Sequence, residues 1–198
     1  MINKIKQKIF LAYYKFLENK EESEFKYLKK SFKKIGNNFN LLKEYTVKNP
    51  QYIEIGDNFL AGYRFRIEAW DIYGEDKFNP KIKIGNNVVF NTDIHIGCIN
   101  SISIGDNCLF GSRIYITDHH HGDPTLEMIK LAPAYRPLIS KGPVVIKNNV
   151  WVGEGVAIMP NVTIGENSII ATNAVVTKDV PNNCVVAGVP AKIIKIIC

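Results

Sequence analysis

Apolar residues in the second half of the chain recur every six positions, in two interleaved rows. The first row consists of Val150, Val156, Val162, Ser168, Ala174 and Val180, and the second of Ile146, Val152, Ile158, Ile164, Ile170 and Val176. A period of six matches neither the 3.6 residues of an α-helical turn nor the strict alternation of a hairpin strand. It is typical of a chain wound into triangular coils, each with three short strands and a small apolar residue stacked at every corner.

A repeated tetrapeptide marks the successive coils, which we expect to start near Ile53. Its copies are Ile55-Gly56-Asp57-Asn58, Ile84-Gly85-Asn86-Asn87, Ile104-Gly105-Asp106-Asn107, Ile146-Lys147-Asn148-Asn149 and Ile164-Gly165-Glu166-Asn167. The last two are 18 residues apart, which is one coil of three hexads, and the earlier gaps exceed 18 by 11, 2 and 24 residues. The insertion of 24 residues lies within the loop 119–143, which is rich in proline. A long ordered loop that leaves a regular solenoid is more often functional than not.

The start of the chain follows a different pattern. Apolar residues recur at helical spacing over residues 2–17, which predicts an amphipathic helix. The polar residues 19–22 are interpreted as a break, followed by a second helix that ends at Gly36. The predicted domains are therefore a helical segment, residues 1–48, and a body of coils, residues 49–198.

The formal charge of +6 is concentrated in the helical segment. Residues 1–48 hold 12 Lys and 5 Glu, whereas residues 49–198 hold 13 basic and 14 acidic residues. A neutral body argues against nucleic-acid binding, which needs a basic reading surface. Two roles stay open for the helical segment, a cap on one end of the coil stack or an interfacial helix on anionic lipid. The lysines that would face lipid are Lys4, Lys6, Lys8 and Lys15.

The bulk composition, with 46% hydrophobic and 22% charged residues, is ordinary for a soluble globular protein. No apolar run reaches the length of a membrane span or of a good signal-peptide core, so we expect a cytoplasmic protein. The cysteines show no paired spacing and are interpreted as free buried thiols. They are Cys98, Cys108, Cys184 and Cys198.

Three stretches carry a resemblance to a known family: residues 117–122 (TDHHHG), residues 149–153 (NVWVG) and residues 176–192. They resemble the hexapeptide-repeat acyltransferases, in the branch that acetylates galactosides, maltose and xenobiotics. The Asp-His-x-His-Gly run and Arg136-Pro137-Leu138 further on are most similar to bacterial O-antigen and capsule sugar O-acetyltransferases. The resemblance covers roughly residues 50–195. It implies an all-β fold, a left-handed parallel β-helix, with acetyl-CoA as co-substrate and a homotrimer whose active sites lie between neighbouring subunits.

The resemblance also implies a histidine base. A sugar hydroxyl, with a pKa far above 7, attacks a thioester only if a base removes its proton, and imidazole titrates near neutrality. Matching the family motif places this base at His121, with His119 as the second candidate and His120 pointing outward. Asp118 either orients an imidazole or forms the turn. The family's oxyanion donor, a backbone amide, corresponds to Glu154.

Further residues match cofactor and acceptor positions of the family. The cofactor candidates are Trp151, Gly153, Thr172, Thr177, Lys178, Lys192 and Lys195, the lysines being suited to the phosphates of CoA. Trp151 can alternatively pack at a coil corner. The acceptor candidates are Asn91, His95, Tyr135 and Arg136. No carboxylate follows Asn91 where galactoside-type relatives carry one, and His95 can equally be a structural residue.

Several functions stay open on the sequence alone. One is an N-acetyltransferase of an amino-sugar nucleotide or an antibiotic-modifying enzyme. Another is a metal-dependent carbonic anhydrase of the same fold, with His95, His119 and His121 around Zn²⁺. A third is a scaffold without catalysis. The block around Trp151 and Lys178, which resembles that of the acetyltransferases, favours an acetyl-CoA-dependent O-acetyltransferase without a metal. Its acceptor would be a bacterial surface polysaccharide, O-antigen or capsule, or its precursor, and the basic helix would keep it at the inner face of the cytoplasmic membrane.

Overall fold

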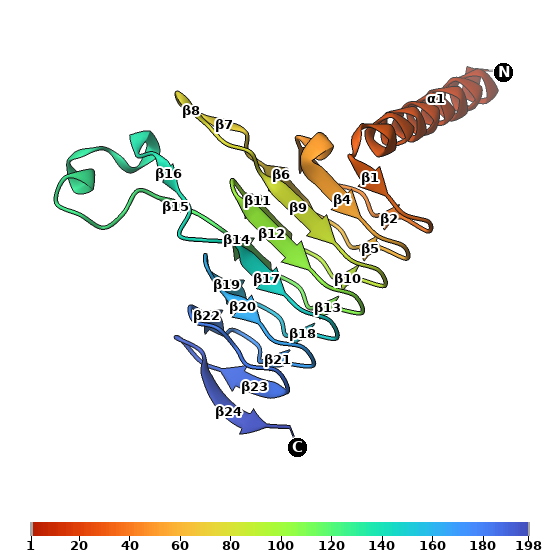
Figure 1. The fold of residues 1–198 in the computed structure, drawn as a ribbon. Coiled ribbons are helices and arrows are strands. Elements are labelled where there is room, and N and C mark those ends of the chain that lie inside the picture. Colours follow the sequence, from red (N-terminus) through yellow and green to blue (C-terminus); the bar gives the residue numbers. More distant parts are fainter. Residues whose placement is uncertain (1, 198) are drawn as a thin grey trace. The chain divides into compact units, whose positions relative to one another are not determined.

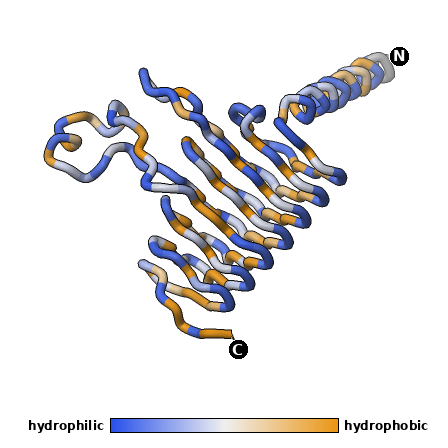
Figure 2. Tube along the Cα trace, in the orientation of Figure 1, coloured by the Kyte–Doolittle hydropathy of each residue, from blue (hydrophilic) through white to orange (hydrophobic). Residues whose placement is uncertain are grey.

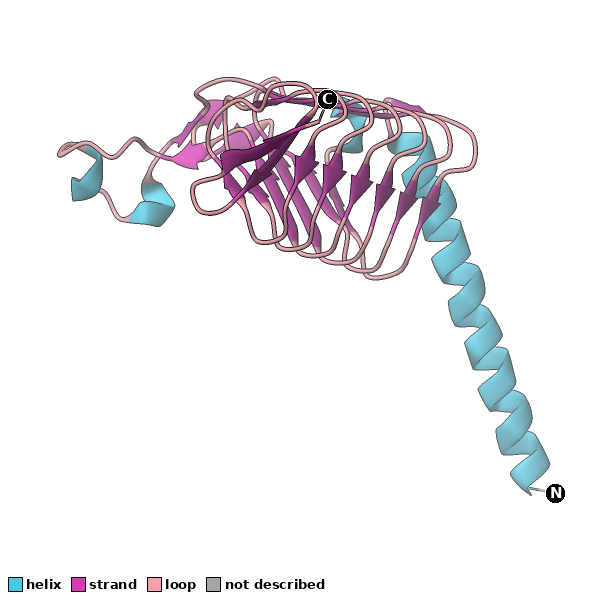
Figure 3. Cartoon of the chain, turned by 90° about the horizontal axis from the view of Figure 1, so that it is seen from below, coloured by secondary structure: helices cyan, strands magenta, loops and turns pink. Residues whose placement is uncertain are grey.

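The computed structural model of the protein describes residues 2–197, with side chains from residue 6 onwards. The chain divides into two units at residues 32 and 33. The first unit is a single helix, α1 (Ile2–Ser31). The second is a parallel β-helix, in which three faces of short strands wind around a buried core (Figures 1 and 3).

Each face is a sheet whose neighbouring strands come from successive coils. Face 1 contains β1 (Lys34–Ile35), β4 (Ile53–Ile55), β9 (Lys81–Ile84), β12 (Ser101–Ile104), β17 (Val144–Ile146) and β20 (Thr163–Ile164). Face 2 contains β2 (Asn40–Leu41), β5 (Leu60–Ala61), β10 (Val89–Phe90), β13 (Leu109–Phe110), β18 (Trp151–Val152), β21 (Ile169–Ile170), β23 (Cys184–Ala187) and β24 (Lys192–Ile196). Face 3 contains β3 (Thr46–Lys48), β6 (Arg66–Ala69), β11 (Ile94–Cys98), β14 (Ile114–Thr117), β19 (Ala157–Ile158) and β22 (Val175–Val176). All these pairs are parallel except β23 with β24, which is antiparallel.

Both six-residue rows of the sequence point into the core, and every member of them is buried. Each coil repeats the same inward positions, so hydrophobic positions recur from coil to coil (Figure 2). Two pairs of rings are stacked, Phe39 on Phe59 and Phe90 on Phe110, with centroid separations of 5.3 and 4.4 Å, and a tilted contact of 6.0 Å between Phe59 and Phe90 joins the pairs.

The cysteines of the coils also lie in this core. Cys98, Cys108 and Cys184 are buried free thiols, as predicted, and burial raises the pKa of the Cys98 and Cys108 thiols. Cys198 lies outside the described residues.

A ladder of asparagines runs along the corner between faces 1 and 2. Each amide nitrogen donates to the amide oxygen of the next rung, over distances of 2.7 to 3.2 Å. Every rung has a positive φ, between 55° and 58°, which asparagine tolerates better than most residues. The rungs are Asn38, Asn58, Asn87, Asn107, Asn149, Asn167 and Asn183.

The two long insertions leave the coils at the corner between faces 3 and 1. The 11-residue insertion forms the antiparallel hairpin of β7 (Ile72–Tyr73) and β8 (Asp76–Lys77). The 24-residue insertion returns through antiparallel β15 (His120–His121) and β16 (Leu138–Ile139). Both project from the same side of the coils in Figure 1.

The described residues also contain three short 3₁₀ helices. η1 (Pro50–Tyr52) precedes β4, and η2 (Met128–Lys130) and η3 (Pro133–Tyr135) lie within the long insertion.

The first coil begins earlier than the sequence analysis placed it. Strand β1 pairs with β4, so the coils start at Lys34 rather than near Ile53. Residues 35–38 are a further copy of the tetrapeptide, Ile-Gly-Asn-Asn, which was misinterpreted as a helix end because glycine is common there. The polar residues 19–22 do not interrupt α1, which is one helix. The roles of α1 as a cap or a lipid contact stay predictions, and the side chains of Lys4 and Ile5 lie outside the described part.

Candidate active site

The outward side chains of face 3 form two parallel rows across neighbouring coils. Arg66, His95 and Tyr115 are register partners in one row. Glu68, Gly97 and Thr117 are partners in the next. Strands of one sheet are about 4.8 Å apart, so these side chains are forced into contact.

His95 is held by a buried carboxylate. Oε2 of Glu68 lies 2.8 Å from a guanidinium nitrogen of Arg66 and 3.3 Å from Nε2 of His95. Burial is the main cause that lowers the pKa of His95, and the positive charge of Arg66 adds to it, while Glu68 opposes both. His95 is therefore neutral at pH 7, with Nε2 facing Glu68.

Asp118 is the most deeply buried acid of the site, with no exposed side-chain surface. Its carboxylate accepts hydrogen bonds from the amides of Ile99 and Asn100, at 2.9 and 2.8 Å, and from the Cys98 thiol at 3.2 Å. Nδ1 of His119 lies 3.0 Å from Oδ1 of the same carboxylate. Burial alone would raise the pKa of this carboxyl, but these donors outweigh burial and hold the pKa below its ordinary value.

The ionised Asp118 decides how His119 is oriented. A carboxylate only accepts hydrogen bonds, so Nδ1 of His119 carries the proton that points to it. Nε2 is then left as a free acceptor, which is the arrangement of a base with an orienting carboxylate. Only 11% of the His119 side chain is exposed. A Cβ on Gly97 would lie 3.4 Å from Cε1 of His119, which is ordinary van der Waals contact, so the imidazole packs directly over this glycine.

His121 lies on the exposed strand β15 and meets a residue of the hairpin. Its Nδ1 is 3.4 Å from the hydroxyl of Tyr73, and the two rings make an edge contact with centroids 5.4 Å apart. His120, the neighbouring residue on β15, is half-buried, and burial lowers its pKa.

These groups surround one cavity of about 180 Å³ on face 3. The structure thus brings together three of the predicted residues, His95, His119 and His121. The other lining residues, which the sequence analysis missed, are Arg66, Glu68, Trp70, Tyr73, Gly97, Tyr115 and Leu138. The 11-residue insertion was the available signal for Tyr73.

Three other predicted residues lie at the corner between faces 2 and 3. Asn91 and Thr172 are exposed there. Glu154 is bound through its side chain to Arg113, at 2.7 Å, and its carbonyl accepts from the amide of Asn173. Within residues 2–197, no hydrogen bond from its own amide to a protein acceptor is formed.

The predicted cofactor residues are spread over the C-terminal coils. Trp151 is half-exposed on the outer side of β18 and does not fill a coil corner, because buried Val150 occupies it. Gly153 is required by packing, since a Cβ would lie 2.7 Å from the amide nitrogen of Thr172. Thr177 and Lys178 are exposed in the turn after β22.

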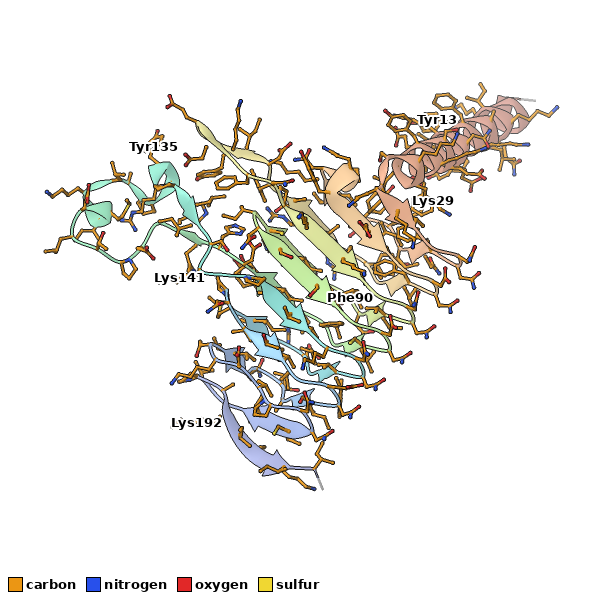
Figure 4. All side chains as sticks on the ribbon, in the orientation of Figure 1. Tyr13, Lys29, Phe90, Tyr135, Lys141 and Lys192 are labelled. Atoms are coloured by element: carbon orange, nitrogen blue, oxygen red, sulfur yellow. The ribbon has the colours of Figure 1, made fainter. Side chains whose placement is uncertain are left out.

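Of the last predicted residues, Lys192, Lys195 and Tyr135 are exposed and Arg136 is half-buried. Lys192 and Lys195 lie on β24, and Figure 4 labels the first of them. Tyr135 and Arg136 lie on the long insertion, where Nε of Arg136 donates to the carbonyl of Leu131 at 3.0 Å.

Two searches for other kinds of site gave negative findings. Among the residues that the structure describes, no group of three or more His, Cys, Asp or Glu is arranged to hold a metal ion. No described helix is long and apolar enough to cross a membrane.

Comparison with known proteins identifies the family. The profile of the family "Bacterial transferase hexapeptide (six repeats)" matches residues 143–178. WbbJ of Escherichia coli strain K12, which is named a lipopolysaccharide biosynthesis O-acetyl transferase, is 38% identical over 154 residues, spanning 75% of this chain and 74% of WbbJ. This chain belongs to the hexapeptide-repeat acyltransferases.

Solved structures agree with this assignment. A hexapeptide-repeat acetyltransferase from Vibrio cholerae is 25% identical, with a TM-score of 0.59 over 90% of this chain and 81% of that one. A galactoside acetyltransferase in complex with coenzyme A is 28% identical, with a TM-score of 0.54 over 89% of this chain and 71% of that one. The fold class and family predicted from the sequence are confirmed, and the coils are a left-handed parallel β-helix.

His119, the second candidate for the base, and Glu154, the predicted oxyanion donor, lie toward opposite edges of face 3 in this hexapeptide-repeat acyltransferase. His119 lies two residues after the end of β14, whereas Glu154 lies three residues before β19, the strand paired with β14. The four residues of β14 span roughly 13 Å.

Replacing Asp118 with Asn tests the buried carboxylate. The amide adds N–H groups to a site that already supplies four donors, so we expect the free energy of unfolding at pH 7 to fall by about 2–4 kcal/mol. Folding lowers the pKa of Asp118, so the ionised carboxylate stabilises the fold above its unfolded pKa, about 3.9, and this is lost as the pH falls through the folded pKa. Denaturant unfolding should show that the difference in free energy of unfolding between the wild type and Asp118→Asn becomes smaller below about pH 4.

The matched control for this substitution is Glu127→Gln, an exposed acid on the long insertion. It should change the free energy of unfolding by less than about 0.5 kcal/mol. An equal loss in the two variants, or a difference that widens in acid, would contradict an ionised, donor-bound Asp118.

Proposed function

We propose that the protein is an acetyl-CoA-dependent O-acetyltransferase that modifies a sugar hydroxyl of a bacterial surface polysaccharide or its precursor. The observation that carries the proposal is His119, which lines the cavity and is held through Nδ1 by buried Asp118. The similarity to WbbJ supports a surface-polysaccharide acceptor. The coenzyme A complex of the similar galactoside acetyltransferase supports the donor.

The residues present fit a CoA thioester. The backbone amide of Glu154 suits the thioester oxygen, which gains negative charge as the bond forms. Lys178, Lys192 and Lys195 are exposed cations on the C-terminal coils, where they can pair with phosphates. When bound, acetyl-CoA supplies an activated acetyl group and a thiolate that can leave.

The chain's own residues supply the proton transfers. Nε2 of His119 removes the hydroxyl proton as the sugar oxygen forms its bond to the acetyl carbon, and Asp118 stabilises the imidazolium that results. His119 then returns that proton to the departing sulfur. We choose His119 over His121, the first choice of the sequence, because His119, unlike His121, has a buried carboxylate as partner.

Single substitutions decide between the two histidines. We expect His119→Ala to lower kcat by about 10²–10⁴-fold, the usual loss when a general base is removed. His121→Ala should cost less, because the orienting carboxylate remains. The measurement is the release of CoA thiol with a panel of surface-polysaccharide sugars.

Calorimetric titration with acetyl-CoA, and with CoA for comparison, is the control, because both variants should still bind. A larger loss of kcat in His121→Ala than in His119→Ala would identify His121 as the base. Absence of acetyl-CoA binding to the wild-type protein would overturn the acyltransferase proposal itself.

The site would be completed in a homotrimer, with the histidines of one subunit facing the Glu154 amide of the next. The placement of these groups toward opposite edges of face 3 supports a second subunit as the source of one of them. Face 2 also carries an outward apolar column, in which Leu60, Leu109 and Trp151 are 37%, 45% and 52% exposed. Contiguous apolar surface of this kind marks interaction sites.

Leu109→Glu tests this column as the subunit interface. Burying a carboxylate between subunits is costly, so we expect light scattering to show the mass of a monomer, with loss of transfer activity. Ser103→Glu, on face 1 of the same coil, is the matched control and should stay trimeric. A trimer that survives Leu109→Glu and dissociates with Ser103→Glu would move the interface to face 1.

We also propose that α1 holds the enzyme at the inner face of the cytoplasmic membrane. Residues 2–17 contain four lysines and no acid, whereas residues 18–31 hold four lysines and four acids. Large apolar side chains are exposed in the same first half, including Ile9 and Phe16 at 64% and 63%. Apolar and basic side chains on one helix suit an anionic lipid surface.

Vesicle sedimentation tests the lipid contact. We expect binding to vesicles that contain phosphatidylglycerol but not to pure phosphatidylcholine, and loss of binding when Lys6, Lys8 and Lys15 are changed together to Glu. Changing Lys20, Lys26 and Lys30 to Glu is the matched control with the same change of net charge. An equal loss in both triple variants would reduce the effect to net charge and contradict a specific contact.

A further inference from the structure

The hairpin β7–β8 contributes one residue, Tyr73, to the histidine cavity. Tyr73 is half-buried, and its ring packs against Trp70 with centroids 6.1 Å apart. Trp70 is in turn covered by the ammonium group of Lys48, 3.1 Å from the ring centroid. The tyrosine ring is therefore fixed by packing that does not depend on its hydroxyl.

The Tyr73 hydroxyl links the hairpin to the long insertion. It donates its proton to the carbonyl of Ala134, over 2.7 Å. A phenol has one proton, so the side of the oxygen that faces Nδ1 of His121 offers only lone pairs. This contact is therefore a hydrogen bond only in the tautomer in which Nδ1 of His121 donates, and in that tautomer Nε2 carries no proton.

Tyr73 thus holds the proton of His121 on Nδ1, as Asp118 holds the proton of His119 on Nδ1. Both histidines present an unprotonated Nε2, and both line the same cavity. Tyr73 also lines a second hollow of about 500 Å³, between the hairpin residues Glu75 and Asp76 and the insertion residues around Tyr135. The hydroxyl therefore lies where the two hollows adjoin.

We propose that Tyr73 is a positioning residue for acceptor binding: it fixes the proton on Nδ1 of His121, so that Nε2 accepts a hydrogen bond from a sugar hydroxyl. The role in acceptor binding rests on the proposed acetyl transfer to a sugar. The control of the His121 tautomer does not, because it follows from the contacts of the free protein.

Tyr73→Phe removes the hydroxyl and leaves the ring against Trp70. Long-range ¹H–¹⁵N spectra of the side chains report which nitrogen of a neutral histidine carries the proton. The chain has four histidines, so single His→Gln variants assign the signals. In neutral His121, we expect an Nδ1–H signature in the wild type and a shift toward Nε2–H in Tyr73→Phe. His119, held by Asp118, serves as the internal reference and should not change.

Wild-type His121 with its proton on Nε2, or an unchanged tautomer in Tyr73→Phe, would overturn the proposal whether or not the protein transfers acetyl groups. A failed acetyl-CoA titration would sink the proposed function and leave this spectroscopic result intact.

Kinetics test the acceptor role separately. We expect Tyr73→Phe to raise KM for the sugar acceptor roughly 2- to 10-fold, the loss of one neutral hydrogen bond, with little change in kcat. Acetyl-CoA affinity should be unchanged. Tyr63→Phe, an exposed tyrosine at the opposite corner of the same coil, is the matched control. A shifted tautomer with an unchanged acceptor KM would refute the link to acceptor binding.

Discussion

Every coil of this protein must stack on the next in register, and the position of the active site depends on that constraint. The inward apolar rows and the asparagine ladder repeat once per coil, so an extra residue within a coil would break both. Extra residues are tolerated only where the chain can leave the stack. The two long insertions leave at one corner, between faces 3 and 1. The side chains of that corner are therefore the ones that become enclosed and can form a cavity.

Enclosure explains the chemistry of Asp118. A carboxylate with no exposed surface is costly unless donors surround it. The coil before supplies them, because its chain bends at Ile99 and Asn100 and turns two amides toward the acid. The charge that results fixes one imidazole nitrogen and frees the other. The register of the coils thus encloses Asp118. Burial is tolerated because donors surround the ionised carboxylate, and the carboxylate in turn orients the imidazole of His119.

Regular parts of this fold were accessible from the sequence because each coil repeats one local rule. The six-residue period predicted the coils, and the gaps between tetrapeptides predicted where both insertions leave. The start of the stack was missed because Gly36 satisfies two rules, the end of a helix and the bend of a coil. Only pairing of Lys34 and Ile35 with the next coil separates them. That pairing is a long-range property, which local patterns do not contain.

The candidate site was less accessible, since its contacts join residues that are distant in the chain. The sequence shows that Asp118 precedes His119 and lies three residues from His121, and either spacing permits contact. Which imidazole receives the carboxylate depends on where strand β14 ends and β15 begins, because the backbone turns between them. Tyr73 lies 48 residues before His121, and no periodic signal marks it. A motif thus names the residues that can do the chemistry, whereas the enclosure built by the insertions decides which nitrogen is free to do it.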